Sequence, residues 1–245
     1  MINILVVGET CKDEFVYCQA KRLAPDVPVP VLEISKTKET PGMAMNVQRN
    51  VLQLIEQCHL VTNDDWQKIV KTRYIHETTN HMFFRIDTPH IIQRIDFSKL
   101  HFNYDAIVIS DYNKGFLSEE DIAKISEKHK FVFLDTKKIV GDWAAKCKFI
   151  KINEYEYKRS EQFLNPHLKS KIIQTLGGRG CSFNGTLYPV QEVEVKDSSG
   201  AGDAFFAAFV VKFLQTQDTE QSIRFANKCA SQVVTERGVS LICQE

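Results

Sequence analysis

The clearest chemical signal of the chain is the stretch Asp-Ser-Ser-Gly-Ala-Gly-Asp at residues 197–203. Residues 204–211 follow it at once and are almost all apolar, a pattern typical of a helix buried in a core. The turn is therefore expected at a buried helix N-terminus. There the free N–H groups of Gly200, Ala201 and Gly202 can point at an anion, and the helix dipole favours negative charge.

Asp203 is unexpected beside an anion site, because a carboxylate repels an anion. Its presence is explained if it accepts a proton from a hydroxyl group that attacks a phosphorus atom. The simpler interpretation is a carboxylate at a helix N-terminus, which an isolated Gly-x-Gly-Asp would favour. The polar motifs elsewhere in the chain favour a catalytic base.

Four further polar motifs come after apolar segments that are typical of strands. They are Asp111–Gly115 after 106–110, Asp135–Lys137 after 131–134, Asn153–Glu156 after 149–152, and Thr175–Gly180 at the end of 172–176. An ordinary loop resembles any one of them, but four in order ahead of residues 197–203 are not expected by chance. In an open α/β sheet, ligands bind at the carboxyl ends of the strands.

Residues 197–205 resemble the C-terminal signature of the ribokinase-like (PfkB) sugar kinases. The resemblance implies that Asp203 is the catalytic base and that the amides of Gly200, Ala201 and Gly202 form the anion hole. It also implies ATP as the phosphoryl donor.

The residues Asn153, Glu154, Tyr155 and Glu156 resemble the family's Asn-x-x-Glu motif, which arranges magnesium, waters and nucleotide phosphates. One carboxylate is chemically sufficient, because Mg²⁺ keeps most of its waters. Glu156 is therefore expected to hold Mg²⁺ through water. Alternatively, Asn153 caps a helix and Glu156 supports the cap, and both roles can coexist. The other nucleotide contacts that the resemblance implies are Thr175, Gly177, Gly180 and Asn227.

On the sugar side, Pro41–Asn46 opens a helix that is expected to run to about Gln57. This stretch resembles the family's Gly-Gly-x-x-Asn motif, in which glycines pack against the sugar and Asn bonds its hydroxyls. The resemblance therefore implies that Gly42 and Asn46 bind the substrate. Met43 departs from the motif, because it stands where the family has its second glycine.

Strands alternating with helices predict a mainly parallel sheet, and the resemblance implies one three-layer α/β/α kinase domain over residues 1–245. Residues 2–8 are the first predicted strand. Asp13 follows in the next turn, either as an acceptor for a sugar hydroxyl or as a loop carboxylate. Ser118 with Asp121 has the spacing of a capping box for a helix to about residue 129.

A small lid sheet is predicted from about 15–34 and 81–95. Prolines confine residues 27–34 to an exposed edge strand. Residues 81–87 and 91–95 are expected to pair through a turn at 87–90. The alternative is a surface meander without a role. Because a small sheet with an exposed edge cannot bury its own apolar face, the lid also predicts a homodimer.

The motifs at 22–31, 38–42, 110–115 and 135–137 resemble one branch of the family, the heptose 7-phosphate kinases. That branch implies phosphorylation of a heptose 7-phosphate at its anomeric hydroxyl, giving the 1,7-bisphosphate. The region 59–74 is much shorter than in the family, with a strand and a helix missing or compressed.

Charge gives a separate reason to expect a phosphorylated acceptor. Arg85, Lys114 and Lys137 are expected to converge on the substrate pocket, and three cations exceed what one nucleotide needs. Each lysine taken alone could be a solvated loop residue. The alternatives are a kinase for another sugar or a nucleoside, and a non-catalytic sugar-phosphate or nucleotide binder.

Composition excludes other classes of function. The chain has 31 basic and 31 acidic residues and a net charge of +0, so charge does not favour nucleic acid or membrane partners. Apolar runs are too short to span a bilayer, and the N-terminus has no basic region of a signal peptide. Seven scattered cysteines without a Cys-x-x-Cys pair predict reduced thiols in the cytoplasm.

Overall fold

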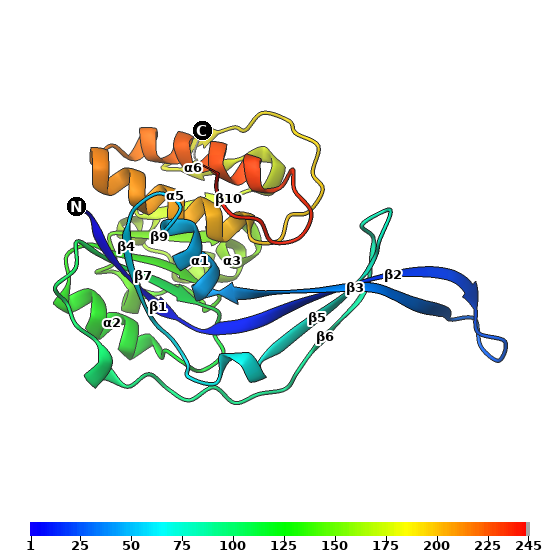
Figure 1. Cartoon of the computed structure of the whole chain (residues 1–245). Coiled ribbons are helices and arrows are strands. Elements are labelled where there is room, and N and C mark those ends of the chain that lie inside the picture. Colours follow the sequence, from blue (N-terminus) through cyan, green and yellow to red (C-terminus); the bar gives the residue numbers. More distant parts are fainter. Residues whose placement is uncertain (244–245) are drawn as a thin grey trace.

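Eight strands form the central sheet of the computed structural model, which describes residues 1–243. Their order is β12-β11-β10-β9-β8-β7-β1-β4 (Figure 1). The strands from β10 to β4 are parallel, which confirms the predicted sheet, and β11 and β12 add an antiparallel edge. The strands are β1 (Asn3–Gly8), β4 (Gln57–Val61), β7 (Ala106–Asp111), β8 (Val132–Thr136), β9 (Phe149–Asn153), β10 (Ile172–Thr175), β11 (Cys181–Phe183) and β12 (Thr186–Tyr188).

Both faces of the sheet are apolar, because the parallel strands lie between two layers of helices. Ile4 and Val6 point to one face and Leu5 and Val7 to the other, as the twofold repeat of a strand requires. The first face packs against α1 (Ala44–Val51), α5 (Ala201–Thr216) and α6 (Thr219–Val233). The second packs against α2 (Glu119–Lys128), α3 (Glu154–Ser160) and α4 (Pro166–Lys169). This confirms the three-layer α/β/α sandwich.

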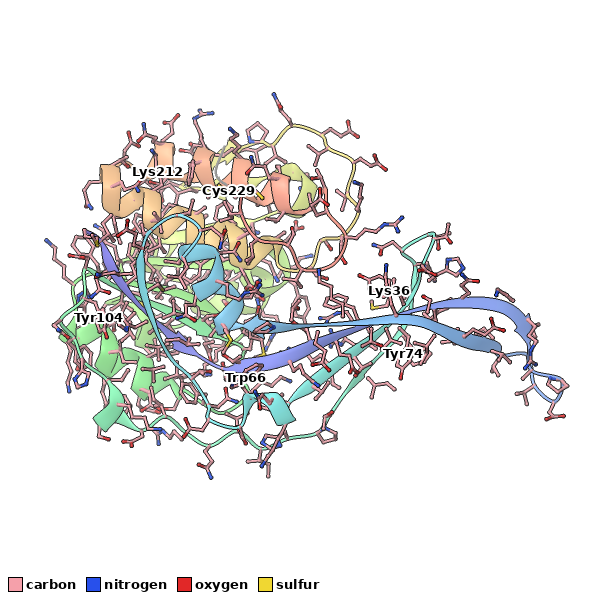
Figure 2. All side chains as sticks on the ribbon, in the orientation of Figure 1. Lys36, Trp66, Tyr74, Tyr104, Lys212 and Cys229 are labelled. Atoms are coloured by element: carbon pink, nitrogen blue, oxygen red, sulfur yellow. The ribbon has the colours of Figure 1, made fainter. Side chains whose placement is uncertain are left out.

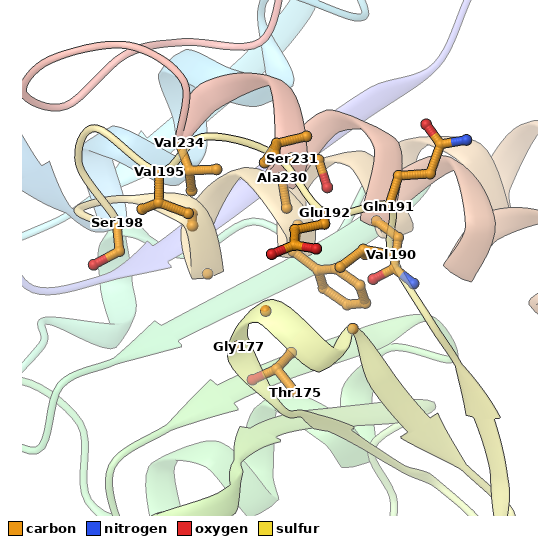
Figure 3. Close-up of a pocket in the computed structure, with 17 residues that line it drawn as sticks. Thr175, Gly177, Val190, Gln191, Glu192, Val195, Ser198, Ala230, Ser231 and Val234 are labelled. Carbon is orange, nitrogen blue, oxygen red and sulfur yellow. The ribbon is translucent and has the colours of Figure 1, made fainter.

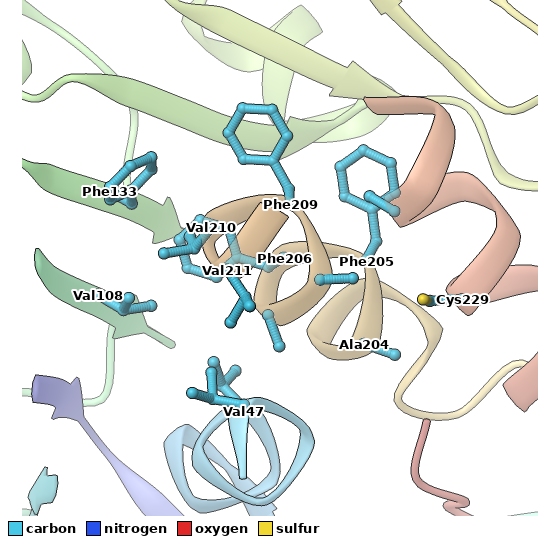
Figure 4. Packing of buried hydrophobic residues seen from close by; sticks show 14 of the residues in the cluster. Val47, Val108, Phe133, Ala204, Phe205, Phe206, Phe209, Val210, Val211 and Cys229 are labelled. Atoms are coloured by element: carbon cyan, nitrogen blue, oxygen red, sulfur yellow. The ribbon is translucent and has the colours of Figure 1, made fainter. Parts of the chain in front are cut away.

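Helix α5 is largely buried, as its apolar sequence predicts. Residues 204–211 are all buried. Figure 4 shows Phe205, Phe206 and Phe209 of α5 between the strands that carry Val108 and Phe133 and the neighbouring helices. The rings of Phe209 and Phe133 meet edge to face, with 6.2 Å between their centroids. The N-terminus of α5 is therefore fixed by a packed core.

A second sheet, the lid sheet, has the order β3-β2-β5-β6 and projects from the sandwich (Figure 1). It consists of β2 (Thr10–Leu23), β3 (Pro30–Met43), β5 (Val70–His76) and β6 (Met82–Asp87). Lys36 and Tyr74 lie on its projecting part, away from the sandwich (Figure 2). Strand β2 follows β1 after the single residue Glu9, and β3 leads directly into α1. The lid sheet is thus joined covalently to the sandwich beside the carboxyl end of β1.

Three expectations about local structure are wrong. Residues 91–95 are not a strand, and β6 pairs with β5 instead. The 91–95 segment lies across the sandwich, where Ile92 and Ile95 are buried and the N–H of Ile95 donates to the carbonyl of Phe116. Helix α1 ends at Val51 rather than Gln57, because the chain turns there to enter β4, which pairs with β1. Asp13 lies within β2 and not in a turn.

The short region 59–74 contains the end of β4, a 3₁₀ turn and the start of β5. The 3₁₀ turns are η1 (Trp66–Lys68), η2 (Phe97–Lys99), η3 (Asp142–Ala144), η4 (Glu161–Phe163) and η5 (Gly177–Arg179). Among residues 1–243 there is no helix with the length and hydropathy needed to cross a bilayer. All seven cysteines lie in this described part and are free thiols, as predicted.

Candidate active site

The turn before α5 has the conformation that its glycines permit. Gly200 is the N-cap of α5 and has φ +83°, a left-handed backbone conformation that residues other than glycine rarely adopt. A Cβ atom on Gly200 would lie 3.0 Å from Nδ2 of Asn46, and one on Gly202 would lie 3.0 Å from Nζ of Lys151. The N–H groups of the first helical turn have no partner within the helix. Ala201 also donates weakly to the carbonyl of Ser198 over 3.3 Å. The turn therefore offers backbone donors above a buried ammonium group.

Asp203 is buried in the first turn of α5 and is held by two side chains. Its Oδ2 accepts a hydrogen bond from Nδ2 of Asn46 over 2.8 Å, and its Oδ1 accepts one from the hydroxyl of Tyr112 over 2.9 Å. Burial raises the pKa of Asp203 above its ordinary value, against the lowering effect of the Asn46 hydrogen bond. A carboxylate with a raised pKa is better suited to accept a proton from a hydroxyl group.

The loop that carries Tyr112 is fixed by Glu9, a residue that the sequence analysis missed. Its two carboxylate oxygens accept the backbone N–H groups of Tyr112 and Lys114, each over 2.8 Å. Its own carbonyl accepts the N–H of Ala44 at the start of α1. Glu9 is fully buried, and burial raises its pKa. A carboxylate directly after the first strand could have indicated this role, since strand ends position sites in such folds.

A row of alternating charges runs from β8 to α3. Nζ of Lys137 lies 2.6 Å from Oε1 of Glu156 and 3.7 Å from Oδ1 of Asp135. Nζ of Lys151, which the sequence analysis also missed, lies 2.8 Å from Oδ2 of Asp135. Burial opposes ionisation of Asp135, but the ammonium groups of Lys137 and Lys151 hold its pKa below the ordinary value. Burial also favours the neutral amine of Lys137, yet Asp135 and Glu156 raise its pKa.

Asn153 and Glu156 form the capping box that was the alternative interpretation of their motif. The Asn153 side chain accepts the N–H of Glu156, and Oε2 of Glu156 accepts the N–H of Asn153, each over 2.8 Å. Oε1 of Glu156 accepts from Nδ2 of Asn153. Oδ1 of Asp135 is buried and makes no hydrogen bond within the described chain. An orphaned carboxylate oxygen near a second carboxylate fits a magnesium ion that keeps its waters.

A cavity of about 610 Å³, the α6 cavity, brings together four of the residues predicted for the nucleotide but not Asn153 or Glu156 (Figure 3). Its lining includes Thr175, Gly177, Gly180, Asn227, Ala201 and Gly202. Glu154 and Tyr155 do not line this cavity. Glu154 forms an ion pair with Arg179 over 2.9 Å, and Tyr155 is 69% exposed on the outside of α3. The cavity thus joins the η5 loop to the turn before α5.

A second cavity of about 740 Å³, the lid cavity, lies between the lid sheet and the sandwich. Its lining includes Met43, Lys71, Asp87, Ile92 and Lys114. The ring of Tyr112 lies close to both the lid cavity and the charge row, because Nζ of Lys71 is 5.3 Å and Nζ of Lys137 is 5.4 Å from its centroid.

Asp13 on β2 and Gly42 on β3 pack against each other where the lid sheet joins the sandwich. A Cβ atom on Gly42 would lie 2.0 Å from Oδ2 of Asp13, so this position requires glycine. Oδ1 of Asp13 accepts a hydrogen bond from Arg73 over 2.6 Å. Asn46 lies three residues into α1 and reaches Asp203 instead.

The three cations expected to converge on one pocket do not do so. Lys137 is balanced by Glu156 and Asp135, and Arg85 is exposed and paired with Asp87 over 2.7 Å. Only Lys114 of the three lies on the lid cavity. Lys71, which the sequence analysis did not select, lines the same cavity because it lies at the start of β5, which pairs with β2 in the lid sheet.

Comparison with known proteins agrees with this architecture. A ribokinase from Thermotoga maritima superposes with a TM-score of 0.74 at 18% identity, covering 98% of this chain and 95% of that one. Phosphofructokinase-2 from Escherichia coli superposes with a TM-score of 0.73 at 14% identity, covering 99% of this chain and 96% of that one. At these identities the likeness shows the ribokinase-like fold.

Curated relatives carry the sequence likeness further. Bifunctional protein HldE of Helicobacter pylori is 27% identical over 305 residues, which covers 100% of this chain and 65% of that protein. The HldE protein of Blochmanniella floridana is 26% identical, which covers 98% of this chain and 61% of that protein. The chain therefore spans less than two thirds of the length of these relatives. The family model described as "pfkB family carbohydrate kinase" matches residues 118–245, more than half of the chain. The chain belongs to the pfkB family of carbohydrate kinases.

Proposed function

We propose that this protein transfers the γ-phosphoryl group of ATP to a hydroxyl group of a sugar. The position of Asp203 carries the proposal. It follows Gly202, which lines the α6 cavity, and it is hydrogen-bonded to Tyr112, whose ring faces Lys71 of the lid cavity. A proton acceptor that adjoins the lining of one cavity and is linked through Tyr112 to the other suits transfer between two bound substrates.

In this mechanism the acceptor hydroxyl gives its proton to Asp203 while its oxygen attacks the γ-phosphorus. The bond from phosphorus to the bridging oxygen breaks, and ADP leaves. The N–H groups of the 200–202 turn and the ammonium of Lys151 stabilise charge on the transferred group. Each donor of such an anion hole contributes about 3–4 kcal/mol in comparable sites. Gly202 lets Lys151 approach, since a side chain there would collide with it.

Magnesium would neutralise the nucleotide phosphates. Glu156 and the unsatisfied oxygen of Asp135 are the groups that would hold it, through water. Lys137 lies between these carboxylates, and its ammonium group helps to hold the pKa of Asp135 below its ordinary value. The nucleotide itself would occupy the α6 cavity, with its base toward Asn227 and its phosphates toward Gly202.

The acceptor in this proposal is a phosphorylated sugar, and specifically a heptose 7-phosphate that becomes the 1,7-bisphosphate. Support comes from the motifs that resemble the heptose 7-phosphate kinases and from the lid cavity, where Lys71 and Lys114 present two cations. Cationic side chains of this kind suit a phosphate group. The lid sheet would cover the bound sugar and keep water from competing as the acceptor.

The test is a steady-state assay with ATP, Mg²⁺ and paired acceptors, each heptose being offered with and without its 7-phosphate. The expected result is phosphorylation of the heptose 7-phosphate, with a higher KM for the free sugar and a raised KM for the phosphate in Lys114→Ala. Equal kinetic constants for the phosphorylated and the free heptose would contradict this acceptor and favour a simple sugar or a nucleoside. Binding of ATP without turnover of any acceptor would indicate a non-catalytic binder.

The lid sheet also supports a homodimer as part of the proposal. Strand β3 is an edge strand, and Ile34 on it is 63% exposed. Val27 and Val29 in the turn that precedes it are exposed as well. A second lid sheet could pair with this edge and cover these side chains. The free thiols suit a reducing compartment, so the cytoplasm is the proposed location.

A further inference from the structure

Met43 has a backbone conformation that residues other than glycine rarely adopt. Its φ is 60° and its ψ is −131°, in a region populated mainly by glycine. Its side chain is nevertheless buried, with 3% of its surface exposed, and it lines the lid cavity. Glycine would relieve the backbone at this position, so the side chain must contribute something that glycine cannot.

The side chain of Met43 contacts the ammonium group of Lys71. Nζ of Lys71 donates to Sδ of Met43 over 3.3 Å. The same ammonium lies over the ring of Tyr112. Burial and the Asp13 carboxylate raise the pKa of the Cys11 thiol to about 12, and the Lys71 ammonium acts to lower it. The Lys71 ammonium therefore contacts a thioether and an aromatic face, both neutral and polarizable.

The carboxylates near Lys71 are occupied by other cations. Asp13 pairs with Arg73, and Asp87 pairs with Arg85. Among the residues that the structure describes, no carboxylate forms an ion pair with Lys71. A half-buried ammonium group whose neighbouring carboxylates pair with other cations is available to bind an anionic ligand. Because Lys114 lines the same cavity, the ligand would meet two cations.

We infer that Met43 is a positioning residue that holds Lys71, together with Cys11 and Tyr112, to bind the phosphate ester of the acceptor. The inference rests on the proposed function and deepens it, since it assigns the phosphate of the acceptor to Lys71. Met43 fixes the ammonium against the cavity wall and does not itself touch the reacting atoms. Its effect is therefore confined to phosphorylated acceptors.

The experiment compares Met43→Gly, Met43→Leu and Lys71→Gln with the unchanged protein, using heptose 7-phosphate and free heptose as acceptors. Lys71→Gln should raise the KM for the phosphorylated sugar about 10- to 100-fold, as expected when a hydrogen bond to a charged group is lost. Met43→Gly should raise it about three- to tenfold, and Met43→Leu by less. In each of the three variants the ratio of the KM for the phosphorylated sugar to the KM for the free sugar should rise, because only the phosphorylated sugar offers an anion to Lys71.

Met45→Leu is the matched control, because Met45 lies two residues away on α1 and does not line the lid cavity. If Met43→Gly does not fold, Met43→Leu and Lys71→Gln still test the inference through the ratio of the KM for heptose 7-phosphate to the KM for free heptose. An unchanged ratio in Lys71→Gln, or equal effects of Met43→Leu and Met45→Leu, would overturn the inference. Absence of turnover in the unchanged protein would instead overturn the proposed function.

Discussion

The hydroxyl of Tyr112 donates a hydrogen bond to Oδ1 of Asp203 over 2.9 Å, across 91 residues of sequence. The opposite oxygen of the same carboxylate is held by Asn46. Two side chains from separate parts of the chain therefore fix the orientation of one carboxylate. The remaining lone pairs of Asp203 are available to the hydroxyl of an acceptor.

Tyr112→Phe should lower kcat about tenfold, because a hydrogen bond to a charged group contributes about 1.5–3 kcal/mol. Burial is the main reason that the pKa of Asp203 is raised above its ordinary value of 3.8, and the Tyr112 hydrogen bond lowers it. Activity should fall as the pH drops through this raised pKa, since the base must be ionised. Loss of the Tyr112 donor should move that acid limb to higher pH.

The pH profile of kcat/KM measures this shift, and Tyr104→Phe is the control, because the Tyr104 ring packs against His59 away from the site. A Tyr112→Phe profile that coincides with the unchanged protein would show that the hydroxyl has no part in orienting the base.

Asp203→Asn should lower kcat at least about 100-fold, in the range that general base catalysis contributes, while ATP binding changes little. The change keeps the size of the side chain and removes the proton acceptor. Turnover and calorimetric nucleotide affinity are the measurements. Asp218→Asn is the control, because Asp218 caps α6 and asparagine caps a helix equally well. Near-normal turnover of Asp203→Asn would assign the base elsewhere.

Glu156→Gln should raise the Mg²⁺ concentration that gives half-maximal rate by several-fold, because a neutral amide replaces a carboxylate. Glutamine can still complete the capping box, so α3 should remain folded. The measurement is the initial rate against Mg²⁺ at fixed ATP, with Glu154→Gln as the neighbouring control on the exposed side of α3. An unchanged Mg²⁺ dependence would show that Glu156 serves only to cap α3 and to pair with Lys137.

Ile34→Asp should weaken self-association by at least about tenfold, because a charge at the edge of β3 opposes pairing of two lid sheets. Sedimentation across the micromolar range should find the unchanged protein as a dimer and this variant shifted toward monomer. Leu52→Asp, at the end of α1, places the same charge on an exposed residue outside the lid sheet. A monomeric unchanged protein at high micromolar concentration would contradict the dimer.

The features that local sequence determines were predictable. The turn before α5 was identified because Gly200 and Gly202 stand directly before an apolar helix. The capping box of Ser118 and Asp121 was identified from spacing alone, and the structure confirms it. The mainly parallel sheet was predicted from the alternation of apolar segments and helices, together with the resemblance, whereas the strand order came from the structure.

Contacts between distant segments were not predictable from the sequence. Lys151 lies on β9 between apolar residues, and nothing in its neighbourhood indicates that it reaches Asp135 and Gly202. The position of Lys71 beside the substrate cavity could be recognised only from the pairing of β5 with β2. Ile92 and Ile95 were assigned to a strand because they are apolar in an extended stretch, but their burial comes from the sandwich and not from a partner strand.

Glu9 has a mechanical consequence that no single contact shows. It is the one residue between β1 and the long lid strand β2, its carbonyl holds the first N–H of α1, and its carboxylate holds the 112–114 loop. A displacement of the lid sheet at Glu9 would therefore be transmitted to the two segments that carry Asn46 and Tyr112. The lid sheet and the two side chains that orient Asp203 therefore share one anchoring residue, so the position of the proposed base is tied to that of the lid sheet.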